Sequence, residues 1–422
     1  MKKNVIIYGA GFVAEKMFLR ICEKYSPLCF VDRDPQKQGT EFFGLPVMPL
    51  EGALTLYPDA EILLSVSHFV KYDIINQLLG SGIPVERIIG VYGPIERRWG
   101  CAYLEQYVGF WRNEMRHCCS LANTYHLPFK TSYGKTSDES YDNYTNNNKR
   151  LIERLQEKEF REKYCGTCRL LKYGYWARHD TFDKINISIE SPCNFNCVYC
   201  GENDGEYGGC ELDDGTFMRL ALQFLKYCKE TGRINDFADV WLAPGEPALH
   251  SMIEEVVDIV KDYRCTIATN ASVYSEPIAD MLKRGISQIR VSIDAGTPET
   301  YAVIRGVRPN MFGKVWENLR KYSRLGHDVI ELQYIILPGQ NTGSADIDGF
   351  CTLAEGVGKR VLISRDRNCM GNIDDEAALA IAQMIHKLKF AGIEARLFSD
   401  AILSFTDEEL ARISVASDKV IS

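Results

Sequence analysis

Short apolar runs alternate with amphipathic segments at the start of the chain, which is the pattern of an α/β fold. The apolar run Val5 to Tyr8 precedes a glycine-rich turn, and residues Ala14 to Glu23 have the apolar spacing of a helix. Further strands are predicted at Cys29 to Asp32, Ile62 to Val66 and Ile88 to Tyr92. These elements predict a small, mainly parallel sheet in residues 1–97.

The same alternation returns between residues 183 and 392, where six predicted strands and six predicted helices follow one another. The predicted strands are Ile185–Ile189, Val240–Leu242, Cys265–Thr269, Gln288–Ile293, Val329–Ile336 and Lys359–Ser364. The predicted helices are Thr216–Glu230, Ser251–Asp262, Glu276–Arg284, Asn310–Leu325, Ala345–Gly356 and Glu376–Ala391. Because strands joined by helices pair in parallel, we expect a partial (β/α)6 barrel. Residues 393–422 are expected to add a C-terminal extension with one strand and a short acidic helix.

A polar module, residues 98–182, separates these two regions. Its cysteines lie in the run Met115 to Cys119, which contains Cys118 and Cys119, and in the C-x2-C pair Cys165 and Cys168. Between them, residues 131–148 are rich in Ser, Thr, Asn and Tyr, and a helix is predicted from Asn148 to Lys163. The cysteines predict a metal centre; iron–sulfur and zinc both remain open, and Cys101, Cys210 and Cys369 are candidates for a further ligand.

Composition narrows the class of protein. The chain has 422 residues, 45% of them hydrophobic, and a net charge of −8. This acidic balance argues against a nucleic-acid partner, because phosphate contacts need basic side chains. No apolar run approaches the ~20 residues that span a bilayer, and Gly9 and Gly11 interrupt the first one, so we expect a cytoplasmic protein without a membrane partner. In that compartment the 15 cysteines favour metal binding over disulfides.

The turn after the first strand has the pattern G-x-G-x-x-A, with Gly9, Gly11 and Ala14. Such a turn directs backbone N–H groups at the start of a helix towards a phosphate, and Asp32 at the end of the second strand is near the position of a ribose-binding acid. The pattern indicates a Rossmann-like, nucleotide-binding sheet. The alternative is that the glycines only allow the strand and the helix to pack closely.

A second group of cysteines, within residues 193–200, predicts a redox-active metal site. Cys193, Cys197 and Cys200 form a C-x3-C-x2-C pattern directly after a predicted strand. Three thiolates can hold three irons of a [4Fe–4S] cluster and leave the fourth iron open. A structural zinc site is the alternative, but it usually has two pairs of ligands, and no second pair follows within ~20 residues.

Other polar residues follow the later predicted strands. Gly245 and Glu246 follow the second, Asn270 the third, Ser292 and Asp294 close the fourth, and Arg365, Arg367 and Asn368 follow the sixth. Because ligands of parallel β/α barrels bind at the carboxyl ends of the strands, these positions predict one site.

The cysteine spacing, with Tyr199 before the last cysteine, resembles the signature of radical S-adenosylmethionine (SAM) enzymes. The resemblance implies that Gly245 and Glu246 receive the SAM amino group, Asn270 lines its pocket, Ser292 reaches the ribose and Arg305 binds the carboxylate. It also implies that an electron from a donor such as flavodoxin or ferredoxin cleaves SAM, giving a radical that removes a hydrogen atom from the substrate. The segment from Val291 to Gly306 resembles the fourth-strand signature of the SPASM/Twitch group.

Two further resemblances concern the preceding regions. Residues 1–97 resemble the small Rossmann-like domain of bacterial sugar acyltransferases, which implies a nucleotide or nucleotide sugar as ligand. The cysteines of residues 98–182 resemble the auxiliary-cluster segment of SPASM or Twitch enzymes, which implies a second, auxiliary iron–sulfur cluster.

The leading interpretation is a radical SAM enzyme that modifies a C–H bond of a small polar substrate, plausibly a sugar or nucleotide sugar. Its reaction could be that of an oxidoreductase or an epimerase. One alternative is a SPASM-type peptide maturase. Two others are an NAD-dependent oxidoreductase with relay clusters and a non-catalytic, zinc-stabilised binding protein.

Overall fold

The structure is a computed structural model of a mixed α/β protein. It describes residues 2–91, 95–111, 113–118, 129–166, 168, 170–177, 181–188, 193–200, 215–243, 245–326, 328–366, 373–398 and 405–421. The chain divides into two compact units. The first comprises Met1–Asn186, Gln223–Val240 and Asp262–Arg264, and the second comprises Ile187–Leu222, Trp241–Lys261 and Cys265–Ser422.

The first unit contains a six-stranded sheet in the order β3-β4-β2-β1-β5-β6. Its strands are β1 (Lys3–Tyr8), β2 (Tyr25–Val31), β3 (Glu41–Phe42), β4 (Leu45–Met48), β5 (Glu61–Leu64) and β6 (Ile88–Ile89). All neighbouring pairs are parallel except β3 with β4. The four strands predicted here are present, although β5 stops before Ser65 and β6 ends at Ile89.

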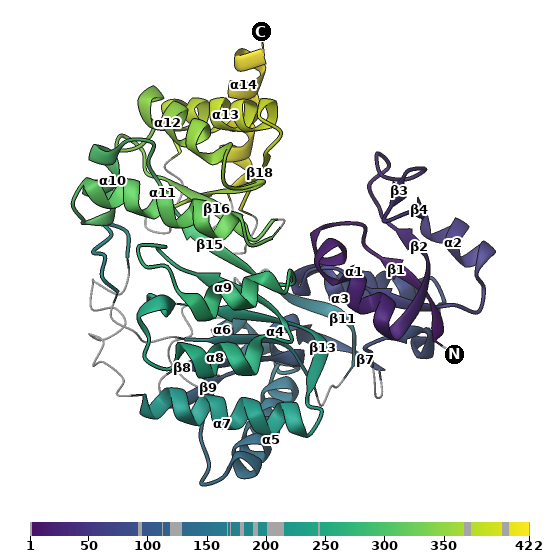
Figure 1. Ribbon diagram of the computed structural model, residues 1–422. Helices are drawn as coiled ribbons and strands as arrows, with labels where there is room; N and C mark the ends of the chain where they lie inside the picture. Colours follow the sequence, from purple (N-terminus) through teal and green to yellow (C-terminus); the bar gives the residue numbers. More distant parts are fainter. Residues whose placement is uncertain are drawn as a thin grey trace. The chain divides into compact units, whose positions relative to one another are not determined.

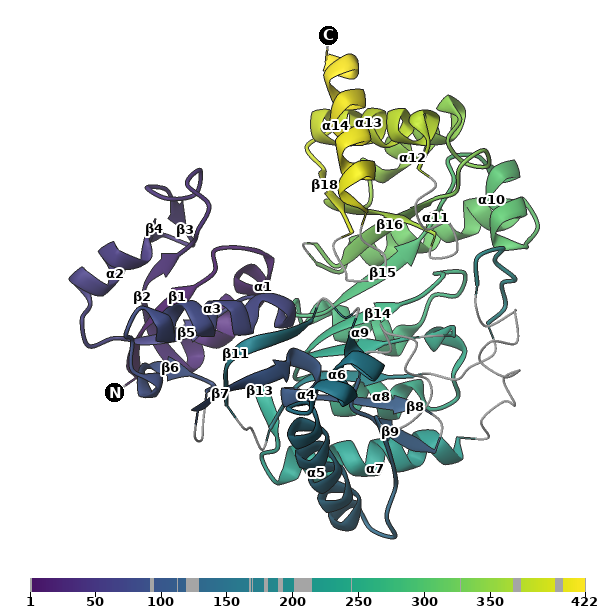
Figure 2. The ribbon, with the colours of Figure 1, turned by 180° about the vertical axis from the view of Figure 1, so that it is seen from behind.

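Helices cover both faces of this sheet because successive side chains of β1 point in opposite directions. Val5 and Ile7 share a buried cluster with Met17 of α1 (Phe12–Lys24), which confirms the predicted helix. Ile6 and Tyr8 pack instead with residues of α2 (Leu50–Leu56) and α3 (His68–Gly80). Figures 1 and 2 show α1 and α3 on opposite sides of the sheet.

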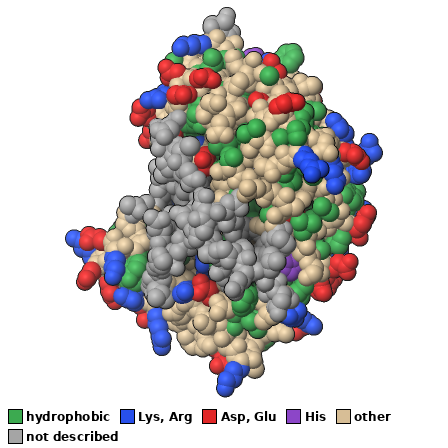
Figure 3. Space-filling model, turned by 90° about the vertical axis from the view of Figure 1, so that its left-hand side faces the viewer, with side chains coloured by type: hydrophobic (Ala, Val, Ile, Leu, Met, Phe, Trp, Pro, Cys, Tyr) green, Lys and Arg blue, Asp and Glu red, His purple; other side chains and the backbone are tan. Residues whose placement is uncertain are grey.

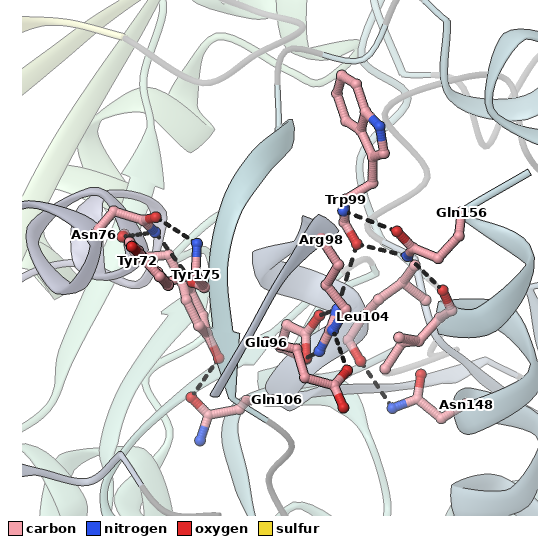
Figure 4. Close-up of polar contacts among 12 residues, drawn as sticks. Tyr72, Asn76, Glu96, Arg98, Trp99, Leu104, Gln106, Asn148, Gln156 and Tyr175 are labelled. Atoms are coloured by element: carbon pink, nitrogen blue, oxygen red, sulfur yellow. Dashed lines mark hydrogen bonds and ion pairs between the residues drawn. The ribbon is translucent and has the colours of Figure 1, made fainter. Parts of the chain in front are cut away.

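A two-stranded antiparallel ribbon packs on the α3 side of the sheet. It pairs β7 (Ile95–Cys101) with β11 (Leu171–Ala177). Trp176 lies in the same buried cluster as Tyr72, and a Cβ at Gly100 would lie 2.4 Å from the Trp176 ring. Asn76 of α3 accepts a hydrogen bond from the Tyr175 N–H at 2.6 Å and donates to its carbonyl at 3.1 Å, as drawn in Figure 4. These contacts join the ribbon to the sheet.

The predicted helix boundaries in residues 131–163 are wrong. The structure has two helices, α5 (Ser137–Arg154) and α6 (Lys158–Cys165). The Thr136 side chain caps α5 by accepting the Glu139 N–H, and the buried Tyr141 and Tyr144 give the polar stretch an apolar face at helical spacing. This apolar face was not recognised in the sequence because tyrosine was counted among the polar residues.

The break between these helices is fixed by Gln156, which both donates to and accepts from the backbone of Trp99 in β7 (Figure 4). Figure 4 also shows Arg98, whose guanidinium binds both carboxylate oxygens of the buried Glu105 in α4 (Ala102–Gln106), at 2.7 and 3.0 Å. The module is therefore held by the exposed side chain of Gln156 and the buried Arg98–Glu105 pair as well as by apolar packing.

The first unit also contains the strand order β10-β9-β8-β12-β13. These strands are β8 (Tyr107–Trp111), β9 (Glu114–Arg116), β10 (Lys130–Ser132), β12 (Phe182–Ile187) and β13 (Ile234–Leu242). Helix α7 (Thr216–Glu230) precedes β13 and has the predicted bounds. Strand β13 begins well before the predicted Val240.

The second unit contains consecutive parallel strands β14 to β18. They are β14 (Arg264–Ala268), β15 (Gln288–Ser292), β16 (Ile330–Ile336), β17 (Arg360–Arg365) and β18 (Glu394–Leu397). The helices are α8 (Ile253–Val260), α9 (Glu276–Lys283), α10 (Pro298–Arg305), α11 (Asn310–Ser323), α12 (Ser344–Ala354), α13 (Asp375–Phe390) and α14 (Asp407–Ile421). The predicted alternation of strands and helices is confirmed, but α10 was not predicted.

Helix α14, the predicted acidic helix, lies along α13 in Figures 1 and 2. Its Glu409 forms a buried ion pair with Arg365 at the end of β17, at 3.2 Å. No helix in the described ranges is both long enough and apolar enough to cross a membrane. On the coloured part of the face in Figure 3, acidic and basic side chains are interspersed.

Candidate functional site

The cysteine loop, residues 193–200, lies in the second unit. Cys193 is exposed, whereas Cys197 and Cys200 are partly buried and are joined by a turn in which the Cys200 N–H donates to the Cys197 carbonyl. Burial raises the pKa of the Cys197 thiol to about 11; Arg305 opposes this, and Asp294, Cys193 and Cys200 add to it. The three predicted thiols therefore share one electrostatic environment.

The backbone of the loop is attached to the end of α10. The N–H groups of Asn196 and Val198 donate to the carbonyls of Arg305 and Ile304, at 3.1 and 2.9 Å. Gly306 follows with a φ of +62°, and a Cβ there would lie 2.2 Å from the Asn196 carbonyl oxygen. Only glycine satisfies both the positive φ and this close approach.

Glu246 is fully buried, although it lies in a loop, where acidic side chains are usually exposed to solvent. One carboxylate oxygen accepts from the Thr269 hydroxyl at 2.6 Å and the Ala248 N–H at 3.1 Å; the other accepts from the Asn270 N–H at 2.6 Å. Burial raises the pKa of Glu246, and these three hydrogen bonds oppose the rise. Glu246 thus fastens the loop after β13 to the end of β14.

Asn270 extends this network to the cysteines. Its side-chain amide donates to the Asn194 side chain at 2.9 Å and approaches the Cys193 sulfur at 3.6 Å. Asn194 in turn donates to the Ser272 hydroxyl at 2.9 Å. Neither Asn194 nor Ser272 was among the predicted site residues, yet both support the segment that begins with Cys193.

Asp294 forms a second buried centre with Arg305 and Tyr199. Its carboxylate accepts from Arg305 at 2.9 Å and from the Tyr199 hydroxyl, and its other oxygen accepts from the Ile335 N–H at 2.7 Å. Burial raises the pKa of Asp294 well above its usual range, while the adjacent guanidinium favours the charged form. Its φ of +61° is strained for a non-glycine residue, as often occurs at functional sites.

The other predicted residues of this site are placed as follows. Gly245 directly precedes Glu246 and has a φ of +89°. Ser292 is partly buried at the end of β15 and pairs in register with Gln333 of β16. Arg365 pairs with Glu409, while Arg367 and Asn368 lie outside the described residues.

Cysteines of the linker module gather in the first unit. Cys101, Cys118 and Cys165 border one apolar cluster. Burial, followed by the charges of Cys118 and Cys168, raises the pKa of Cys165 to about 12. The structure thus groups predicted ligands with Cys101, a candidate for a further ligand, whereas Cys119, Cys210 and Cys369 lie outside the described residues.

The predicted nucleotide turn is also well defined. Gly9 has a φ of +108°, and a Cβ there would lie 2.6 Å from the Ser65 carbonyl oxygen. Asp32 accepts from the N–H groups of Ala10 and Asp34 and from Lys37. Burial would raise the pKa of Asp32, but these contacts outweigh it and lower the pKa. At Gly11 the nearest atom to an added Cβ is the Lys37 Nζ at 3.9 Å.

The cysteine loop lies within a region that matches a known protein family. Residues 187–348 match the family described as "Radical SAM superfamily". GTP 3',8-cyclase of Acaryochloris marina (strain MBIC 11017) is 31% identical over 169 residues, covering 38% of this chain and 49% of the cyclase. GTP 3',8-cyclase of Microcystis aeruginosa (strain NIES-843 / IAM M-2473) is 29% identical over 172 residues, covering 39% and 50%. The chain spans about half the length of these curated relatives.

Among solved structures, Streptococcus suis SuiB bound to S-adenosylmethionine aligns with a TM-score of 0.40 and 12% identity, covering 64% of this chain and 57% of SuiB. A TM-score of this size is too low to establish a shared architecture.

Residues 187–348 thus match the radical SAM superfamily, whose enzymes work with a [4Fe–4S] cluster and SAM. The predicted enzyme class and these two cofactors are thereby confirmed, while the SPASM/Twitch assignment is not part of the match. In the described residues no three His, Cys, Asp or Glu side chains converge on a single ion. The loop nevertheless fits a cluster, because each thiolate binds a different iron and the three need not meet at one point.

Proposed function

We propose that this radical SAM enzyme holds its cluster through Cys193, Cys197 and Cys200 and removes a hydrogen atom from a small polar substrate. The bound cluster and SAM supply the radical. The proposal is carried by the hydrogen-bonded series from Glu246 through Asn270 to Cys193, which connects the predicted SAM pocket to the cysteine loop.

Apart from Ser292, the predicted SAM contacts belong to two groups of side chains. Glu246, with Gly245 before it, would face the amino group, and Asn270 would orient both the pocket and Cys193. Arg305 would meet the carboxylate, with Asp294 and Tyr199 fixing its guanidinium. Ser292 would reach the ribose. An arginine suits this role because its planar fork can bind a carboxylate through two N–H groups.

We propose a nucleotide or nucleotide sugar as the substrate class. The relatives are named for a reaction of GTP, which favours a nucleotide over a peptide, although the chain spans only half of their length. The Rossmann-like interpretation of residues 1–97 supports the same class, with phosphate at Gly11 and ribose near Asp32. Lys37 adds a cation beside this turn.

The linker module would carry an auxiliary iron–sulfur cluster on Cys118, Cys165 and Cys168, with Cys119 or Cys101 as a further ligand. The grouping of Cys101 with these thiols supports four ligands. An electron donor of the flavodoxin or ferredoxin type would reduce the radical SAM cluster. Residues 183–392 would form the partial barrel that surrounds the SAM site.

Anaerobic reconstitution with iron and sulfide tests the proposal. The protein is incubated with SAM, dithionite and a panel of nucleotides and nucleotide sugars, and 5'-deoxyadenosine is measured by mass spectrometry. We expect formation by the wild type and none by a variant with Ala at 193, 197 and 200. Cys22→Ala, far away in sequence on α1, is the control. Undiminished 5'-deoxyadenosine in the triple variant would refute the assignment.

A further inference from the structure

A cavity of about 350 Å³ lies within the first unit, and all of its lining residues belong to that unit. It lies where the chain leaves the parallel sheet at Leu64, Ser65 and Val66, directly after β5. The sheet order β2-β1-β5 means that connections diverge between β1 and β5. The cavity borders the carboxyl ends of β5 and β6 beside this point, and open parallel sheets bind ligands outside the carboxyl ends of their strands.

One wall of the cavity is apolar. It is formed by Val13, Met17 and Ile21 on one face of α1, together with Ile89 and with Phe237 of β13. Phe237 and Val13 pack against the buried cluster that contains Met17 and Ile21, so this wall is part of a packed core. Such a surface suits the flat face of a ring.

The opposite wall carries charges that are already paired. Lys71 of α3 binds Asp183 of β12, and Arg264 binds Asp239 of β13 at 3.1 Å. Arg264 and Lys184 hold the pKa of Asp239 below its usual value even though burial would raise it. Lys184 also binds Asp239, at 2.5 Å, so each of these cations already has a carboxylate partner and an added phosphate would have to break an ion pair.

The buried side chain of Gln106 holds Lys71 in position. The Gln106 side-chain oxygen accepts from Lys71 at 3.1 Å and from the Tyr72 hydroxyl at 3.0 Å; Figure 4 shows the contact between Tyr72 and Gln106. Gln106 is 1% exposed. This contact keeps the Lys71 ammonium group beside Asp183, so the charged wall of the cavity has a fixed arrangement.

Hydrogen-bonding capacity remains in this wall. Within the described residues, the Ser65 hydroxyl, one Asp183 oxygen and the Arg264 Nε are buried without a hydrogen-bond partner. These atoms offer a hydroxyl, an anionic acceptor and a cationic donor from three different elements. Buried polar atoms of this kind normally have hydrogen-bond partners. Because all three belong to residues that line one cavity, we expect a bound ligand to supply the missing partners.

We propose that this cavity binds a neutral ring bearing hydroxyl groups, namely the sugar or the ribose of a nucleotide ligand. Ring hydroxyls can donate to Asp183 and accept from Arg264 or Lys71 without breaking either ion pair, while the ring face packs on Met17 and Phe237. The inference rests on the proposed nucleotide-type substrate and adds residues outside the glycine turn to its binding site.

Calorimetry on the full-length protein, without SAM or reductant, tests this assignment. The probes are UDP-glucose, UDP, GTP and inorganic pyrophosphate, and the variants are Asp183→Asn and Ser65→Leu. Loss of a hydrogen bond to a charged group costs ~1.5–3 kcal/mol, so Asp183→Asn should weaken binding at least about ten-fold. Ser65→Leu should do the same by filling the cavity.

The matched control is Asp73→Asn, which removes an exposed carboxylate from the same helix as Lys71. It should leave every affinity unchanged. If UDP-glucose binds more tightly than UDP, the cavity takes the sugar; if UDP and GTP bind as tightly, it takes the ribose. The assignment is overturned if no nucleotide binds, if only pyrophosphate binds, or if both cavity variants bind like the wild type. Intact 5'-deoxyadenosine formation alongside such a result would separate this failure from failure of the proposed function.

Discussion

A Cβ atom at Gly306 would lie 2.2 Å from the carbonyl oxygen of Asn196, so the cysteine loop can approach the end of α10 this closely only because residue 306 is glycine. We therefore expect Gly306→Ala to displace residues 196–198 from α10 and to lower the iron content after reconstitution by at least half. Iron and sulfide analysis, with the absorbance of the cluster, measures this loss.

Gly313→Ala is the control for that substitution. Gly313 lies in α11 with nothing within 4 Å of an added Cβ, so alanine should keep the iron content and stabilise the helix by about 0.5–1 kcal/mol. Equal iron in the two variants would contradict a supporting role for Gly306.

Replacement of Glu246 tests whether it has a structural role before SAM arrives. In Glu246→Gln, the single amide oxygen can accept only part of the three hydrogen bonds that Thr269, Ala248 and Asn270 donate to the carboxylate. A buried N–H left without an acceptor costs ~1–3 kcal/mol, so the protein without SAM should unfold at lower urea concentration. The exposed Glu254→Gln on α8 should unfold like the wild type. A Glu246→Gln variant of unchanged stability would mean that Glu246 serves SAM alone.

The buried pair Asp294–Arg305 should be costly to break from either side. Asp294→Asn leaves the Arg305 guanidinium buried beside a neutral group, and we expect a loss of about 3–5 kcal/mol, as for other broken buried pairs. Chemical unfolding of the protein without cofactors measures this change. The exposed pair Lys283–Asp280 supplies the comparison, since solvent screens it and Asp280→Asn should unfold like the wild type.

Acid should destabilise the first unit through His68. Burial, aided by Lys71 and Lys184, lowers the pKa of His68 to about 3, so the folded protein keeps this ring neutral. Between about pH 6.5 and 3 the unfolded chain binds a proton that the folded chain does not, and stability falls as pH falls. His68 accounts for up to about 1.4 kcal/mol per pH unit of this slope, and His68→Asn should remove that part.

The two glycines of the first turn should respond differently. Gly9→Ala forces a Cβ against Ser65 at a φ of +108°, so the unfolding free energy should fall by about 1–3 kcal/mol. Gly11→Val has space and should preserve the fold, but its side chain would block a phosphate at the start of α1. Thermal unfolding and calorimetry with UDP-glucose separate these effects. A Gly11→Val variant with wild-type affinity would assign the turn to packing alone.

The sequence allowed the strands to be predicted because apolar runs such as Ile330–Ile336 stand between clear helical segments. It could not reveal pairings between distant residues. Asp294 lies 11 residues before Arg305 and 95 after Tyr199, and nothing in either motif specifies that these three side chains share one buried centre. Helix α5 was mislocated because its buried face consists of Tyr141 and Tyr144 within an otherwise polar stretch. Cys101 was only one of several candidates because the pattern of C-x2-C does not encode its distant neighbours.

The chain passes between the two compact units at five points, after residues 186, 222, 240, 261 and 264. During synthesis, the first unit therefore lacks part of its own structure until Arg264 has left the ribosome, by which time segments of the second unit have already emerged. Neither unit can be obtained as one continuous fragment by cutting the chain, and a stop after residue 186 would omit Phe237 and Asp239, which line the cavity. Circular permutation would not free the first unit either, because its three segments are separated by residues that belong to the second.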